Sequence, residues 1–206
     1  VALEHSIGAL IFIPILLKSW KTIKVLGQRE WMAILWIAIF GGILGTFFYT
    51  KALGYINYIN LSVVVLLQKL QPVFAIALSS IILKEKLSKR FISLAIVAIL
   101  GGYLVTFGSA STLVWNDKAI IASLLAILSA FCWGSSTVLG KHALKILPYE
   151  AVTSLRLSLT ALFALLVLFA TSEATTVLYL TTIQWQRVIM IVFSSGAVAL
   201  AIYYYG

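Results

Sequence analysis

The sequence predicts an all-α protein, a polytopic membrane helix bundle, and three observations support this fold class. Hydrophobic residues make up 62% of the chain and charged residues only 10%, whereas an average globular chain is about half apolar and a quarter charged. The few charges are bunched between long apolar runs. These runs lack the alternation of membrane barrel strands, and helices are the other structure that satisfies the backbone in lipid.

Seven apolar runs are candidates for membrane spans, because a bilayer core needs roughly 20 apolar residues per helix. The first run is shorter than the others and begins at the start of the sequence, and the last run is still helical in character at residue 206. We therefore expect an internal fragment of a longer protein. The expected spans are residues 2–17, 31–50, 59–83, 91–108, 119–140, 148–170 and 185–205.

Short connections with turn and cap residues separate these runs, which leaves no room for a soluble domain. Gly54 and Asn60 lie between the second and third runs, and Ser88 precedes the fourth. Asp117 precedes the fifth run, and Pro148 occupies the first turn of the sixth. Each is a residue type that starts or stops helices.

The basic residues set the predicted orientation. Ten of the 15 Lys and Arg residues fall in three alternate connections, and the positive-inside rule places these connections in the cytoplasm. The first, third, fifth and seventh spans then run inward and the others outward. The ten residues are Lys18, Lys21, Lys24, Arg29, Lys84, Lys86, Lys89, Arg90, Lys141 and Lys145.

The second and seventh spans align without a gap at an offset of 154 residues. The alignment pairs Trp31 with Trp185, Gly42 with Gly196, and Tyr49 with Tyr203. Because the two spans are five helices apart, they cross the membrane in opposite senses, which is typical of an inverted repeat and of alternating access. Coincidence is the alternative, since these residue types are enriched in membrane helices.

Several short motifs follow one another in the order of a known family. The chain reads LQKLQPVF at 67–74, LKEKL at 83–87 and GG at 101–102, then AFCWG at 130–134, followed by Lys141 and Arg156. This order resembles the EamA-type repeat of the drug/metabolite transporter superfamily. His5 departs from the pattern, because it stands where a counterpart of Arg156 is expected and only after a three-residue shift.

The resemblance implies a ten-helix inverted-repeat (5+5) transporter, of which seven spans are present. Residues 1–109 would be the first EamA-type repeat without its first helix, and residues 119–206 the second without its last two. It also implies gradient-driven transport of small metabolites, such as amino acids or drugs, with export favoured over uptake. The alternatives are a scaffold or lipid-handling membrane protein, or a seven-helix receptor or facilitator if the chain is complete.

We expect no enzyme, no cofactor and no metal site. His5, His142 and Cys132 are isolated from one another in the sequence, and HExxH, GxSxG and Walker A motifs are absent from it. The expected partners are the lipid bilayer and a small-molecule substrate, with a homodimer left open. A net charge of +9 does not point to nucleic acid, because no polar segment is long enough to form a basic face. The expected location is a bacterial inner membrane, as a multi-pass protein.

Lys69 is the strongest candidate for a substrate-binding residue. It lies about ten residues into the third run, where a charge costs about 3 kcal/mol on insertion scales and is usually functional. We expect it to bind an anionic substrate group or to titrate during transport. The alternative is that Lys69 only pairs with Glu4 or with backbone carbonyls.

Gln68 and Gln71 flank Lys69 and share one helix face. Pro72 lacks the amide that would bond the carbonyl of Gln68, so it predicts a helix kink with a free carbonyl beside Lys69. The three side chains would then form a polar pocket. Gln68 and Gln71 could equally bridge neighbouring helices.

The remaining candidates lie on other spans. Arg156 either contacts substrate or snorkels to the cytoplasmic surface. Trp133, Tyr49 and Tyr203 either line the substrate pathway or anchor helix ends at the interface. For coupling to a gradient the candidates are Glu4, which is the carboxylate expected inside the membrane, and His5.

Overall fold

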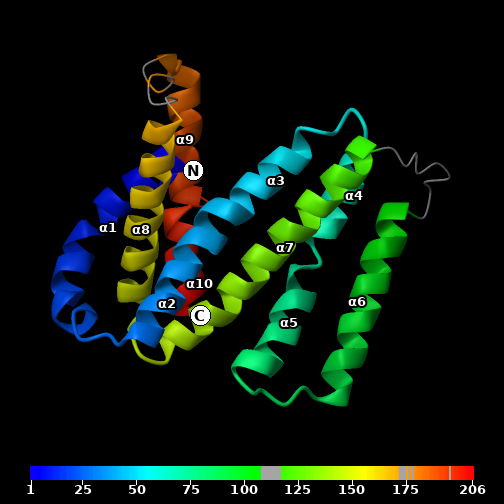
Figure 1. Cartoon of the computed structure of the whole chain (residues 1–206), viewed down its shortest axis with the longest axis horizontal. Coiled ribbons are helices and arrows are strands. Elements are labelled where there is room, and N and C mark those ends of the chain that lie inside the picture. Colours follow the sequence, from blue (N-terminus) through cyan, green and yellow to red (C-terminus); the bar gives the residue numbers. More distant parts are fainter. Residues whose placement is uncertain (108–116, 172–174, 176, 178, 195) are drawn as a thin grey trace. The chain divides into compact units, whose positions relative to one another are not determined.

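The computed structural model describes residues 1–107, 117–171, 175, 177, 179–194 and 196–206, and every regular element among them is helical (Figure 1). This confirms the predicted all-α class. The elements are α1 (Ala2–Ile23), α2 (Gln28–Trp36), the π-helix η1 (Ile37–Leu44), α3 (Gly45–Leu53), α4 (Leu61–Gln68), α5 (Gln71–Ile82), α6 (Lys89–Phe107), α7 (Asp117–Leu144), α8 (Tyr149–Ala170), α9 (Thr182–Ser194) and α10 (Ala197–Tyr205).

Helices occur at all seven positions where spans are predicted. Within the described residues, six helical segments are long and apolar enough to cross a membrane: 2–23, 28–53, 61–82, 117–144, 149–170 and 182–205. The seventh predicted span corresponds to the 19-residue α6, whose membrane crossing stays a prediction. Residue 108 of that predicted span, and residues 108 and 109 of the first predicted repeat, lie outside the described part of the chain.

The chain divides into two compact units. Unit 1 comprises residues 1–43 and 139–206, and unit 2 comprises residues 44–138. Both divisions fall within continuous helical segments: one between Ile43 and Leu44 in η1, the other between Val138 and Leu139 in α7. No loop separates the units at either place.

Unit 1 is built around α8. Helices α1, α2 and α10 pack against it, and α1 lies beside it along much of its length (Figure 1). Small and branched residues of α8, such as Ala151 and Val152, form one buried cluster with Ile34 and Ile37. Closely packed small residues are typical of helix contacts in membranes.

The π-helix η1 brings its backbone close to α8 at Gly42. A Cβ at Gly42 would overlap the side chain of Thr160, so this contact requires glycine. The Thr160 hydroxyl donates to the carbonyl of Ala38 at 3.0 Å. The wide turns of a π-helix often lie at functional positions, and here they are bonded by a side chain of the neighbouring helix.

The glycine that the sequence alignment pairs with Gly42 has a different setting. Gly196 lies between α9 and α10, and its amide donates to the carbonyl of Ile191 at 2.7 Å. Helix α10 begins immediately after it, at Ala197.

Unit 2 has its own buried core, formed where α3, α4 and the first half of α7 meet. The cluster includes Ala52, Val64 and Ala122. Asn60 caps α4 by accepting a hydrogen bond from the Ser62 amide at 2.9 Å. Ser129 of α7 donates to the carbonyl of Gly45 at 2.8 Å, at the point where η1 becomes α3.

Candidate functional site

The guanidinium of Arg156 is bonded inside unit 1. Its Nη1 donates to the hydroxyl of Tyr204 on α10 at 2.9 Å, and its Nη2 donates to the carbonyl of Gly41 in η1 at 3.3 Å. Tyr204 is only 4% exposed. The side chain therefore bridges three elements of the bundle, which differs from the snorkelling alternative.

The charge of Arg156 has no carboxylate partner among the residues that the structure describes. Both of its hydrogen bonds go to neutral acceptors, and its Nε is buried without any hydrogen-bond partner. His5 of α1 lies close enough to interact with it electrostatically and carries no negative charge. Arg156 is partly buried, and a cation inside a membrane bundle without a counter-ion is costly and marks a functional position.

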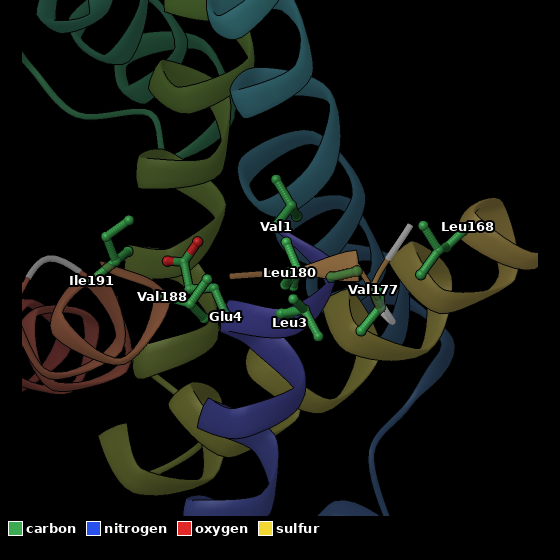
Figure 2. A pocket seen from close by; sticks show the side chains of 9 residues that line it. Val1, Leu3, Glu4, Leu168, Val177, Leu180, Val188 and Ile191 are labelled. Carbon is green, nitrogen blue, oxygen red and sulfur yellow. The ribbon is translucent and has the colours of Figure 1, made fainter. Parts of the chain in front are cut away.

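The two coupling candidates lie on the same turn of α1. His5 is 9% exposed, and its Nδ1 lies within hydrogen-bond distance, 3.0 Å, of the Val1 carbonyl. Glu4 lines an apolar pocket of about 300 Å³, where Figure 2 shows its carboxylate directed toward Ile191 of α9. A Cβ on Gly196 would lie 2.9 Å from that carboxylate.

The predicted tyrosine on the last helix is not the one that contacts Arg156. Tyr203 is 54% exposed, and its proposed role in the substrate pathway stays a prediction. Tyr204 was missed, although helical spacing could have found it. Positions 197, 200 and 204 share one helix face, and both Ala197 and Tyr204 are buried.

In unit 2 the third predicted span is interrupted at Lys69. Helix α4 ends at Gln68 and α5 begins at Gln71, with Pro72 in its first turn. Gln68 is buried and donates to the side chain of Gln71 at 3.2 Å. Lys69 is exposed on this unit, and no carboxylate among the described residues pairs with it. Their roles with substrate stay predictions.

Two predicted aromatic residues meet in unit 2. The rings of Tyr49 and Trp133 have their centroids 5.6 Å apart, and both side chains are partly buried. The next residue, Gly134, is closely approached by α5, because a Cβ there would lie 2.8 Å from the Gln71 carbonyl. The backbone of Gln71 therefore lies against the turn of α7 that carries Trp133.

Within the described residues, no group of three or more His, Cys, Asp or Glu gathers. The absence of a metal site stays a prediction. Cys132 is buried and free.

Long apolar helices with bonded polar side chains between them define the class: this is a multi-pass integral membrane protein. The family follows from a direct match. The model of the EamA-like transporter family matches residues 1–107 and 120–206, so the chain belongs to that family. The two matched segments fall within the two predicted repeats, whose inverted relation stays a prediction.

Two known proteins illustrate the relationship. The riboflavin transporter ImpX of Fusobacterium nucleatum subsp. nucleatum is 38% identical over 187 residues, covering 90% of this chain and 62% of the relative. The chain thus spans less than two thirds of that relative's length. A solved crystal structure shares the fold with a TM-score of 0.66 and 21% identity, covering 98% of this chain and 66% of the other.

Proposed function

We propose that the protein transports small metabolites across the membrane by gradient-driven alternating access. The observation that carries this proposal is the Arg156 guanidinium, bonded to neutral groups inside a bundle of a transporter-family chain. A merely structural helix contact has no need for such a costly group. A bacterial plasma membrane is the proposed location, since the matched relative is bacterial.

The π-helix η1 supports the alternating-access part of the proposal. Irregular turns are places where a helix bends more easily than in a regular α-helix. Bending at η1 would allow parts of the bundle to move during transport.

Riboflavin is the first substrate to test, because the relative that matches 90% of this chain is a riboflavin transporter. The chemistry of unit 2 suits a flat, polar heterocycle. The Tyr49–Trp133 pair offers aromatic surface, and Gln68 and Gln71 offer amide donors and acceptors. Glu4 and His5 are the proposed coupling residues, and export is the proposed direction.

The test is flux of radiolabelled riboflavin in proteoliposomes that contain the full-length protein, with and without a proton gradient. Trp133→Leu and Lys69→Met should lower the flux at least several-fold. The matched controls are Trp20→Leu and Lys51→Met, because Trp20 and Lys51 are exposed residues of other helices. These controls should leave the flux near the wild-type value.

Absence of flux for riboflavin and for a panel of amino acids and drugs would favour the scaffold or lipid-handling alternative. Wild-type flux in both Trp133→Leu and Lys69→Met would remove the unit 2 site while leaving transport itself intact. Flux that is unaffected by any ion gradient would contradict the coupling role of Glu4 and His5.

A further inference from the structure

We propose that Arg156 binds an anionic oxygen of the transported molecule, such as a phosphate or carboxylate oxygen, and that this oxygen takes the place of the Tyr204 hydroxyl. Neutral riboflavin lacks such an oxygen, so the inference favours a phosphorylated flavin over riboflavin itself. The inference rests on the proposed transport function and deepens it by naming a chemical group of the substrate. In this proposal, the hydrogen bond between Arg156 and Tyr204 holds α10 against α8 until an anion binds.

The first argument is that the hydrogen-bond donors of Arg156 are not all satisfied in this conformation. Arg156 Nε has no acceptor. Its Nη1 donates to the Tyr204 hydroxyl, a neutral acceptor that an anionic oxygen can replace. One free donor beside a replaceable neutral acceptor is suited to a ligand that brings acceptor oxygens.

The second argument is charge. The groups around the guanidinium are the Tyr204 hydroxyl, the Gly41 carbonyl and the His5 ring, and none of them is an anion. The nearby acid Glu4 points instead toward Ile191 and Gly196. An anionic oxygen adds attraction between full charges to the guanidinium hydrogen bond, which the neutral oxygen of a phenol does not. An anion therefore competes well against a phenol for Arg156.

The third argument is the place of Tyr204 in the bundle. Its ring is packed closely on Gly140 of α7 and is part of the buried cluster around α8. The hydrogen bond to Arg156 thus ties the C-terminal end of α10 to the centre of unit 1. Its release by an anion would loosen α10 at the moment of binding.

The test compares two flavins that differ by one phosphate, flavin mononucleotide and riboflavin. Their binding to the full-length protein in phosphatidylcholine nanodiscs is measured by quenching of flavin fluorescence. We expect flavin mononucleotide to bind about tenfold more tightly than riboflavin, the gain of one charge-assisted bond. Arg156→Gln should bring this ratio close to one, whereas Arg187→Gln, at an exposed arginine of α9, should preserve it. If Arg156→Gln fails to fold, Arg156→Lys should retain part of the ratio.

The exchange itself is tested by Tyr204→Phe, which removes the competing acceptor and keeps the ring. Affinity for flavin mononucleotide should rise about three- to tenfold, and Tyr203→Phe on the exposed side should not change it. A fall in affinity with Tyr204→Phe would show that the tyrosine positions Arg156, and would overturn the exchange.

Two further outcomes separate the possible errors. If phosphatidylglycerol in the nanodisc weakens flavin mononucleotide binding in the wild type and not in Arg156→Gln, the anionic oxygen belongs to a lipid headgroup and the substrate assignment is wrong. If riboflavin flux is normal but the two flavins bind equally, the anion inference fails and the transport function stands. If neither flavin binds or is transported, both fail.

Discussion

Gly42→Ala tests the closest contact between η1 and α8. The added Cβ would lie 3.0 Å from the Cβ of Thr160 and nearer still to its Oγ1 and Cγ2. Both helices carry other close contacts, because Thr160 is bonded to Ala38 and Ile37 is fully buried. The neighbours therefore have little room to move aside.

The expected magnitude is the difference of two terms. Overpacking a buried contact by one methyl group costs about 1–3 kcal/mol. Replacing glycine by alanine within a helix recovers about 1 kcal/mol. The free energy of unfolding should therefore fall by about 1 kcal/mol, which corresponds to a fall in Tm of roughly 2–4 °C for a chain of this size.

The assay is thermal unfolding of the detergent-solubilised protein, followed by tryptophan fluorescence. Gly101→Ala is the matched control, because a Cβ there meets no atom within 4 Å. It should raise the Tm slightly through helix propensity alone. Thr160→Ala is the second background in which Gly42→Ala is measured. By itself Thr160→Ala loses the hydrogen bond to Ala38, which is worth about 1 kcal/mol.

The double variant Gly42→Ala/Thr160→Ala gives the decisive result. Since Thr160→Ala removes the two atoms nearest the new methyl group, adding Gly42→Ala to it should cost nothing further. The coupling energy between the two sites should be at least about 1 kcal/mol. An equal loss of stability from Gly42→Ala in both backgrounds would refute the proposed contact.

Three other predictions follow from the fold. Asn60→Ala should cost about 1 kcal/mol by leaving the Ser62 amide uncapped, seen as a lower Tm; no change would mean that this cap is unimportant. Cys132, buried in α7, should react with a maleimide only after denaturation, so fast labelling of the folded protein would contradict its burial. Cysteines placed at Lys21 and at Tyr179 should be labelled from opposite sides of the membrane, and labelling from one common side would exclude the inverted repeat.

Helix positions could be read from the sequence because lipid imposes one requirement on every span. A run of about 20 apolar residues has few options other than a helix, and the helices lie within a few residues of the expected ranges. The main differences are at the ends, such as α1, which continues to Ile23 beyond the predicted residue 17. Polar residues at a helix end lower hydropathy without ending the helix.

Irregularities inside the helices were less predictable. The π-helix η1 is bonded to Thr160, which lies more than a hundred residues away in the sequence. Dependence on tertiary contacts also explains why the sequence pointed to Tyr203 and not to Tyr204. An aromatic residue at a helix end is compatible with an interface anchor, and only the packed bundle shows that Tyr204 contacts Arg156. Such pairings depend on tertiary contacts that local patterns do not contain.

The helical joints between the two units have a mechanical consequence. The chain passes between the units at Ile43–Leu44 and at Val138–Leu139, and both joints lie within unbroken helix. Any displacement of one unit against the other therefore has to bend two helices. The joint at Ile43–Leu44 lies in the wide turns of η1, whereas the joint in α7 is regular α-helix. Bending should therefore be concentrated in η1 rather than in α7.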